Sequence, residues 1–120
     1  MYLQRSFKNK FSFEQRFNEA IRVLNKYPDR IPIICERSTT SARDCPIIDK
    51  IKYLVPRDLT IGDFLYVIRK KLYLPSEKAI FLFVGNTIPP TTCLIDQLYH
   101  IYKDADNYLY ITYDQENVFG

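Results

Sequence analysis

The sequence contains no tryptophan, a single histidine and only three cysteines. Cys35, Cys45 and Cys93 are odd in number, widely spaced and without a CxxC pair, which argues against a disulfide framework and against a zinc site. We therefore expect reduced thiols. No apolar run approaches the roughly eighteen residues of a membrane-spanning helix, and the N-terminus lacks the apolar segment of a signal peptide. These absences favour a cytoplasmic protein.

Glycine is scarce as well, and one of the three glycines is the final residue, Gly120. A glycine carboxylate has no Cβ to hinder attack, and its backbone reaches φ values closed to other residues. It can therefore enter a narrow active site for transfer to an amine. Chance or a trimmed chain would give the same ending, because glycine is common in proteins. The residue alone leaves these alternatives open.

Groups that could carry catalysis are few. His100 lies near an expected helix end, where a capping or solvated histidine is the more frequent case. Cys35 lies in an apolar segment, which is typical of a buried, inert thiol. The sequence contains no GxGxxG, P-loop, HExxH or EF-hand pattern. We predict a protein that is not an enzyme, with no catalytic residue, no cofactor and no metal site.

What the sequence does contain is a globular composition, with 47% hydrophobic, 26% charged and 15% aromatic residues. Such a chain fits one domain with well-packed sheet. Its charge is uneven: residues 1–26 hold six cations against two acids, and residues 103–120 hold one cation against four acids. The basic segment suits an acidic partner or an anionic membrane surface, and equally the solvated face of a helix. No nucleic-acid partner is expected, because RNP, helix-turn-helix and finger signatures are missing.

Capping signals and apolar periodicity predict the helices. Ser12 begins a capping box before an amphipathic stripe that ends near Lys26. Thr60 caps a second stripe that reaches Leu72. A short basic helix is expected between residues 4 and 10.

Strand-forming runs and turn residues complete the predicted order. The strands are residues 31–35, 53–55, 79–84, a short strand from 88, and 108–113. Pro32 restricts the first strand to a sheet edge or to its own first residues. Gly85 and Asn86 supply a turn. Thr91 or Thr92 is expected to cap a short helix that follows.

The order of these elements is a helical extension followed by β-β-α-β-β-α-β. Two hairpins packed on a helix, with the final strand inserted centrally, resemble the β-grasp fold of ubiquitin. We therefore predict an α+β, ubiquitin-like β-grasp domain with two extra N-terminal helices. The expected divisions are a helical extension at residues 1–26, the β-grasp domain at 27–113 and a flexible tail at 114–120.

Several unbroken stretches resemble the GABA-receptor-associated protein and microtubule-associated light chain 3 family of autophagy modifiers, and most of all the GABA-receptor-associated branch. They are residues 26–34, 52–56, 58–62, 64–71, 83–84, 88–91 and 109–111, followed by Gly120. The agreement spans nearly the whole chain in order.

The resemblance implies a role for Gly120. In that family an E1-like enzyme activates the terminal glycine with ATP, cysteine thioesters pass it to an E2-like enzyme, and it is joined to the amine of phosphatidylethanolamine. The modifier then moves from the cytoplasm to the autophagosome membrane. In many relatives residues follow the glycine and a cysteine protease removes them, and a deconjugating protease is an implied partner. The expected protein is a monomer.

The resemblance also implies a groove for cargo receptors and adaptors with a short aromatic-x-x-aliphatic motif, which would add to an exposed second strand. The aromatic pocket would use Glu19, Val23, Pro32, Ile34, Lys50, Lys52, Leu54 and Tyr108. The aliphatic pocket would use Tyr53, Val55, Pro56, Leu59, Phe64, Val67 and Ile68. Arg30, Lys50, Lys52 and Lys71 would meet acidic residues beside the motif. Phe64 and Ile68 lie on the apolar stripe of their helix, so we expect them to be half core.

Other features leave alternatives open. Phe81 and Phe83 share one strand face and form a possible second surface, although core burial is the simpler explanation. The loop at residues 36–49 is longer than in close relatives, Tyr108 stands where many have phenylalanine, and Lys71 replaces an arginine. An alternative function is an unconjugated adaptor whose basic N-terminal helices bind tubulin or membrane receptors.

Overall fold

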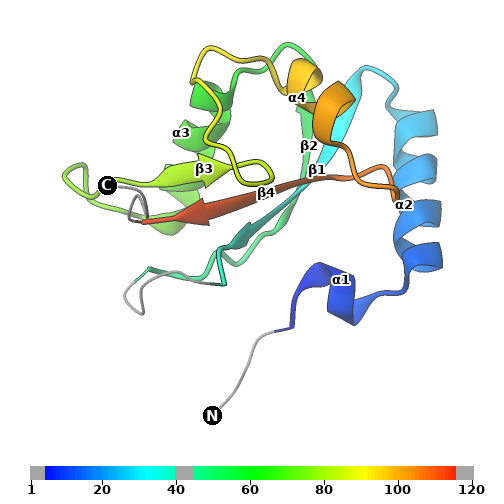
Figure 1. The fold of residues 1–120 in the computed structure, drawn as a ribbon, viewed down its shortest axis with the longest axis horizontal. Helices are drawn as coiled ribbons and strands as arrows, with labels where there is room; N and C mark the ends of the chain where they lie inside the picture. The colour runs from blue at the N-terminus through cyan, green and yellow to red at the C-terminus, as the bar shows by residue number, and fades with distance from the viewer. Residues whose placement is uncertain (1–4, 40–44, 116–120) are drawn as a thin grey trace.

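Four helices and one mixed sheet of four strands form residues 5–39 and 45–115, which are the parts of the chain that the computed structural model describes (Figure 1). The helices are α1 (Phe7–Lys10), α2 (Phe13–Lys26), α3 (Ile61–Leu72) and α4 (Ile95–Tyr102). The strands are β1 (Arg30–Arg37), β2 (Lys52–Pro56), β3 (Phe81–Phe83) and β4 (Leu109–Asp114). The predicted α+β ubiquitin-like class, with two helices ahead of the first strand, is confirmed.

The last strand lies in the middle of the sheet. The strand order is β2-β1-β4-β3, with β1 antiparallel to β2 and parallel to β4, and with β3 antiparallel to β4. This pairing confirms the predicted central insertion. It leaves β2 and β3 as the two edges among the described strands.

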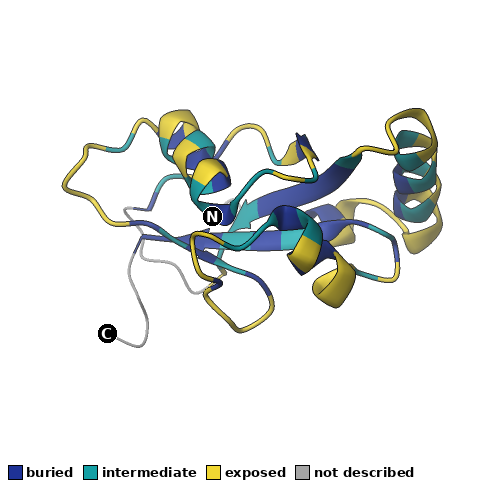
Figure 2. Ribbon diagram, turned by 90° about the horizontal axis from the view of Figure 1, so that it is seen from above, coloured by how far each residue is buried: buried dark blue, intermediate teal, exposed yellow. Residues whose placement is uncertain are grey.

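The two faces of the sheet carry separate apolar clusters. The larger cluster joins alternate residues of β1 and β2, such as Ile33 and Tyr53, to Phe64 of α3 and Leu98 of α4. The smaller cluster contains Phe7 of α1, Ala20 of α2, Ile34 of β1 and Tyr108. Figure 2 shows buried residues along the strands and on the helix sides turned toward them. The N-terminal helices therefore cover the face opposite α3 and α4.

Strand β1 is a central strand although it contains Pro32. The N–H of Cys35 donates to the carbonyl of Ile51 on the β2 side at 2.8 Å, so alternate backbone positions, including Pro32, turn away from β2. Pairing of β1 with β4 begins only at Ile33, opposite Leu109. The missing N–H of Pro32 thus faces a side that β4 has not yet reached. The expected place near the start of the strand is confirmed, and the alternative of an edge strand is wrong.

Helix α2 begins at its predicted capping box, and α3 begins at its predicted N-cap, Thr60, which also forms a capping box. The Ser12 hydroxyl accepts the Gln15 N–H at 3.2 Å, and the Gln15 side chain accepts the Ser12 N–H at 2.9 Å. The Thr60 hydroxyl accepts the Asp63 N–H at 3.1 Å, and the Asp63 carboxylate accepts the Thr60 N–H at 3.3 Å. Local hydrogen bonding therefore fixes both helix starts.

The predicted start of α4 at Thr91 or Thr92 is wrong. The Thr91 carbonyl accepts the Gly62 N–H at 2.9 Å, and a Cβ on Gly62 would lie only 3.1 Å from that oxygen. Leu94 forms an antiparallel bridge with Thr60. The segment before α4 is therefore held extended against the start of α3, and the helix begins only at Ile95.

The predicted short strand from residue 88 is absent from the described structure. The backbones of Val84 and Thr87 exchange two hydrogen bonds, of 2.9 and 3.1 Å, as an isolated bridge, and Ile88 is exposed. Gly85 has φ 61, which suits the first central residue of a type II′ turn. The predicted turn is confirmed, and the β-grasp domain has four strands here instead of five.

Phe81 and Phe83 do not belong to the core. They alternate with Ile80, Leu82 and Val84, which are all buried, while both phenylalanines are only half-buried. The expectation of core burial is wrong because the alternation of β3 turns the other three side chains inward. A second surface at these two residues stays a prediction.

The C-terminal tail begins later than expected. Asp114 is the last residue of β4 and pairs with Phe81, and Gln115 is buried. The boundary placed between residues 113 and 114 is therefore corrected to a point beyond Asp114. Gly120 lies outside the described residues.

Urea unfolding can test that Thr60 caps a helix and that Thr92 does not. Thr60→Ala removes the side-chain acceptor at the start of α3 and should lower the free energy of unfolding by about 1 kcal/mol. Thr92→Ala, a matched change at the rejected cap, should alter it by less than about 0.5 kcal/mol. Equal losses in the two variants would contradict the assigned caps.

Candidate functional site

The outer edge of β2 pairs with no other strand among the described residues. Since the Cys35 N–H donates to the Ile51 carbonyl, the residues of β2 that point their backbone toward β1 are Tyr53 and Val55. Lys52 and Leu54 therefore turn their N–H and C=O groups toward the open side. Such an edge can accept another extended chain through main-chain hydrogen bonds.

One side of this edge faces α2 and carries the residues of the predicted aromatic pocket. Pro32, Ile34 and Tyr108 are buried and form the floor of this face. Glu19, Val23 and Leu54 are half-buried, and Lys50 and Lys52 are exposed. The Lys52 ammonium contacts the Glu19 carboxylate at 2.7 Å and so joins the edge strand to α2.

Two aromatic residues that the sequence did not indicate complete this side. Lys52 Nζ lies 5.4 Å from the Phe7 ring centre and 5.9 Å from that of Phe11. Phe7 is buried and meets the Tyr108 ring edge-on, with 5.4 Å between ring centres. These contacts come from α1, whose only sequence signal was a short basic segment. Helix α1 therefore lies beside the residues of the predicted aromatic pocket.

The Tyr108 hydroxyl is a polar group among the residues of the predicted aromatic pocket. Tyr108 is 2% exposed, and within the described residues its oxygen makes no hydrogen bond of ordinary length. Burial, together with the nearby negative charge of Glu19, raises the pKa of Tyr108. The floor therefore differs in polarity from one made by phenylalanine.

The other side of the edge faces α3 and carries the residues of the predicted aliphatic pocket. Tyr53 and Val55 are each 8% exposed, Leu59 and Val67 are half-buried, and Pro56 is exposed. Phe64 and Ile68 are 0% exposed, so they are wholly core and not half core as expected. They support the pocket from below: the Phe64 ring meets Tyr53 edge-on at 5.3 Å.

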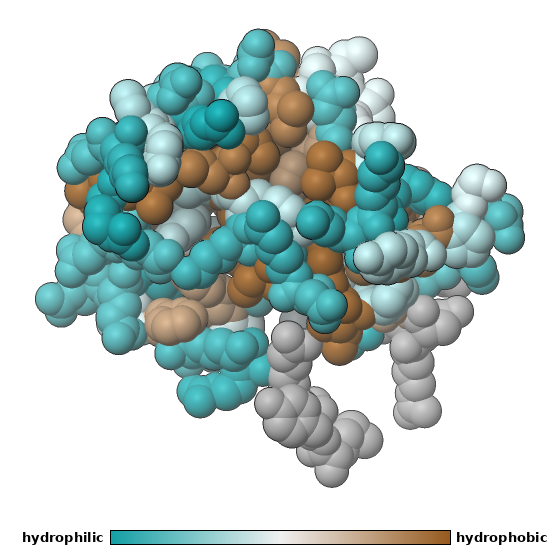
Figure 3. Space-filling model, turned by 180° about the vertical axis from the view of Figure 1, so that it is seen from behind, coloured by the Kyte–Doolittle hydropathy of each residue, from teal (hydrophilic) through white to brown (hydrophobic). Residues whose placement is uncertain are grey.

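Cations surround both sides of the edge. The Arg30 guanidinium lies 3.4 Å from the Leu54 carbonyl, Lys50 Nζ lies 5.2 Å from the Tyr53 ring centre, and Lys71 is exposed at the end of α3. On the rear of the molecule, apolar side chains gather across the middle of the surface between more hydrophilic rims (Figure 3). An apolar segment flanked by acidic residues would fit this pattern.

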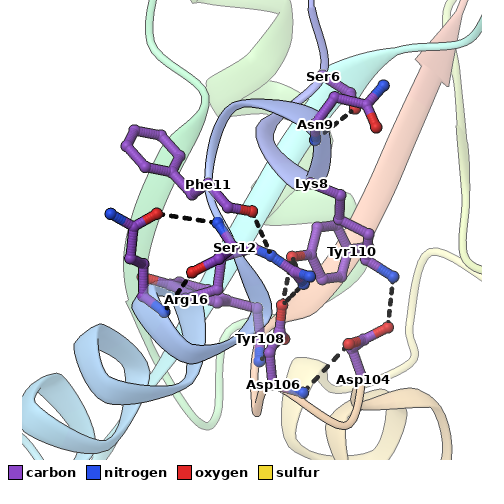
Figure 4. A network of polar contacts seen from close by, with 11 residues as sticks. Ser6, Lys8, Asn9, Phe11, Ser12, Arg16, Asp104, Asp106, Tyr108 and Tyr110 are labelled. Carbon is purple, nitrogen blue, oxygen red and sulfur yellow. Dashed lines mark hydrogen bonds and ion pairs between the residues drawn. The ribbon is translucent and has the colours of Figure 1, made fainter.

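A buried carboxylate network holds α2 in place beside the pocket (Figure 4). Asp106 is 0% exposed, and its carboxylate accepts hydrogen bonds from the Arg16 guanidinium, the Tyr110 hydroxyl and the Tyr108 N–H. Burial and the hydrogen bond to Asp106 raise the pKa of Tyr110. The network therefore ties α2 to the segment that leads into β4.

A second carboxylate fastens α1 beside this network. Lys8 Nζ contacts Asp104 at 2.6 Å, and Asp104 also accepts the Asp106 N–H at 3.1 Å. Burial opposes ionisation of Asp104, but these two hydrogen bonds and the Lys8 charge outweigh it and hold the pKa of Asp104 below its usual value. Both N-terminal helices are thus attached to one short segment.

The described residues show no arrangement of catalytic or metal-binding side chains. His100 is exposed and lies 3.5 Å from Asp96, and burial raises the pKa of the Cys35 thiol. Within residues 5–39 and 45–115 no group of three or more His, Cys, Asp or Glu side chains could hold a metal ion. No helix there is long and apolar enough to cross a membrane.

Comparison with known proteins gives one family. Residues 15–120 match the family model described as "Autophagy protein Atg8 ubiquitin like". The chain is 52% identical to autophagy-related protein 8 of Candida glabrata over 118 residues, which cover 98% of each chain. It is 51% identical to the Saccharomyces cerevisiae protein of the same name, over 98% of this chain and 99% of that protein. The GABA-receptor-associated branch stays a prediction, since these relatives do not distinguish it.

Solved structures give the same result. The crystal structure of Trypanosoma brucei ATG8 has a TM-score of 0.87 and 39% identity, and covers 98% of this chain and 100% of that one. Plasmodium falciparum Atg8, solved in complex with a Plasmodium falciparum Atg3 peptide, has a TM-score of 0.85 and 38% identity, over 95% and 98% of the two chains.

The Asp106 network predicts that loss of Asp106 lowers the free energy of unfolding much more than loss of Lys8. Asp106→Ala leaves the Arg16 guanidinium buried without its carboxylate and should lower the free energy of unfolding by about 3 to 5 kcal/mol. Lys8→Ala removes the more exposed ion pair and should cost at most about 1 kcal/mol. Chemical denaturation of both variants at neutral pH measures the difference. Similar small losses would show that the network does not hold α2.

Proposed function

This chain belongs to the Atg8 family of ubiquitin-like autophagy proteins, and we propose that Gly120 is conjugated to phosphatidylethanolamine on autophagosomal membranes. Members of the family are modifiers and not enzymes, so the reaction draws its catalytic groups from other proteins. ATP activates the Gly120 carboxylate, enzyme thiols carry it as a thioester, and the lipid amine displaces the last thiol to form an amide. The protein contributes the carboxylate.

Two observations support this role. The first is the structure of a family member, from Plasmodium falciparum, with a peptide of Atg3, which supports an E2-like partner for this chain. The second is the place of the tail. β4 ends at Asp114, so the six residues that follow reach at most about 20 Å when extended. An extended tail of that length would be long enough to carry the reacting carboxylate away from the folded surface.

We further propose that the β2 edge binds the aromatic-x-x-aliphatic motif of cargo receptors and adaptors. The observation that supports this proposal is the open edge of β2, with apolar side chains beside it on each face of the sheet. Successive side chains of a strand point to opposite faces, so residues three apart in an added strand do the same. The aromatic residue then enters beside α2, and the aliphatic residue enters beside α3.

The expected affinity of this groove is modest. Each pocket would bury an apolar side chain worth roughly 2 to 3 kcal/mol. Main-chain hydrogen bonds add little net free energy, and ordering the peptide has a cost. The sum corresponds to a dissociation constant around micromolar. Many lipid-anchored copies on one membrane would raise the effective strength, so cargo capture would depend on conjugation.

An unconjugated adaptor that binds tubulin through α1 and α2 is less well supported. Two of the six cations in residues 1–26 already have partners within the fold: Lys8 contacts Asp104, and Arg16 contacts Asp106. Less charge is therefore free for an acidic protein partner. Partners that fit the conjugated form are E1-like and E2-like enzymes, a deconjugating cysteine protease and motif-bearing receptors.

The role of Gly120 predicts a specific loss of conjugation. Gly120→Ala adds a Cβ beside the reacting carboxylate and should reduce the yield on phosphatidylethanolamine vesicles, with the cognate enzymes and ATP, by at least about tenfold. Val118→Ala, in the same tail, should keep most of the yield. The shift of the conjugate on a gel measures both. Equal yields from Gly120→Ala and the unmodified chain would refute the assignment.

The groove predicts loss of peptide binding when both sides are truncated. Tyr53→Ala with Leu54→Ala removes one side chain from each pocket and should weaken binding of an aromatic-x-x-aliphatic peptide by at least about 100-fold. Tyr66→Ala, a tyrosine truncation on the outer side of α3, should leave affinity unchanged. Calorimetric titration gives the affinities, and circular dichroism checks the fold. Unchanged affinity in the folded double variant would remove the assigned pockets.

A further inference from the structure

A shallow hollow lies on the outer side of α3, away from the β2 edge. It has a volume of about 710 Å³ and is lined by Tyr66, Arg69, Lys70, Tyr73, Leu74 and Ser76. We call these six residues the tyrosine-lysine surface. Tyr66 is 60% exposed and Tyr73 is 92% exposed. Two large aromatic side chains, one within α3 and one directly after it, therefore face solvent.

The surface has a fixed shape. The Arg69 guanidinium donates to the carbonyl of Lys78 at 2.6 Å and to that of Pro75 at 3.0 Å, which holds the loop after α3 against the helix. Tyr73 has φ 55, and its N–H donates to the Lys70 carbonyl at 3.2 Å. A left-handed conformation is costly for a tyrosine, so the surrounding bonds impose this exposed position.

The charge of this surface is basic. Residues 66–78 contain four cations and one acid, Glu77. The Arg69 guanidinium is occupied by backbone carbonyls, so the exposed cations are Lys70, Lys71 and Lys78. Lys70 Nζ lies 4.8 Å from the Tyr66 ring centre. Tyrosines beside lysines are typical of protein surfaces that meet the headgroup region of an anionic membrane.

The surface also lies at the end of the molecule from which the tail leaves. The loop after α3 runs into β3, and Phe81, the first residue of β3, pairs with Asp114, the last residue of β4 (Figure 1). Residues 115–120 reach at most about 20 Å. A lipid attached at Gly120 would therefore bring this end of the fold close to the bilayer.

We propose that the tyrosine-lysine surface is the face that the lipid-anchored protein lays on an anionic membrane. The inference rests on the proposed conjugation at Gly120. An acidic peptide is a poorer fit, because the outer side of α3 has no strand edge for main-chain pairing. Lysine ammonium groups also lack the bidentate geometry with which arginine holds carboxylates. A shallow surface with separate point charges suits a layer of lipid headgroups.

A lipid-contact measurement tests the proposal without the conjugating enzymes. The full chain, with Cys93→Ser and a hexahistidine appended after Gly120, is anchored to nickel-chelating lipid in phosphatidylserine vesicles. A fluorophore is placed at Ser76→Cys in the surface or at Ile101→Cys, an exposed control site on α4. Nitroxide-labelled lipid should quench the fluorophore at residue 76 at least about threefold more than at residue 101.

Charge reversal provides the matched comparison. Lys70→Glu with Lys78→Glu should lower quenching at residue 76 at least about twofold, whereas Lys26→Glu with Lys103→Glu, an equal change of net charge elsewhere, should not. Equal quenching at the two label sites, or no effect of the Lys70 and Lys78 reversal, would overturn the proposal. Binding of a soluble acidic peptide at residue 76 without lipid quenching would assign the surface to a protein partner and would also overturn it.

Conjugation of the untagged chain is scored separately on a gel. Failure of conjugation with retained lipid contact would remove the proposed function and leave the surface assignment standing. Successful conjugation without lipid contact would remove the surface assignment alone.

Discussion

The position of β4 between β1 and β3 is the constraint on which the other features depend. Because the last strand pairs with the first in the middle of the sheet, β2 stays at an edge of the sheet. The segment before β4 carries Asp106, which binds Arg16 and so holds α2 beside that edge. The end of β4 pairs with Phe81, so the described chain ends beside β3. One strand thus connects the proposed peptide groove, the N-terminal helices and the segment that leads to Gly120.

The N-terminal helices turn a sheet edge into a site with two unlike sides. Without α1 and α2, Ile34 and Tyr108 would face water, and an added strand would find a pocket only beside α3. The Asp106 network makes this covering rigid, since a buried carboxylate with three donors has no comparable alternative arrangement. The ion pair between Lys52 and Glu19 joins β2 to α2 beside the predicted aromatic pocket, where it would contact an incoming aromatic residue.

The sequence predicted the elements whose causes are local. The capping box at Ser12, the N-cap at Thr60 and the turn at Gly85 each depend on a few neighbouring residues, and all were found as expected. The start of α4 was missed because it depends on the Thr91 carbonyl bonding to Gly62, across the fold. The pairing of Arg16 with Asp106 joins residues 90 positions apart, so no local pattern could indicate it. Phe7 and Phe11 were missed for the same reason: only the docking of α1 brings them to Lys52.

The central claim is that β2 accepts a peptide as an added strand, and amide hydrogen exchange of individual residues tests it most directly. The backbone groups of Lys52 and Leu54 face the open side, while those of Tyr53 and Val55 already pair with β1. Saturation with an aromatic-x-x-aliphatic peptide should therefore slow exchange at Lys52 and Leu54 and leave Tyr53 and Val55 nearly unchanged. Equal protection of all four amides, or protection confined to α3, would contradict strand addition at this edge.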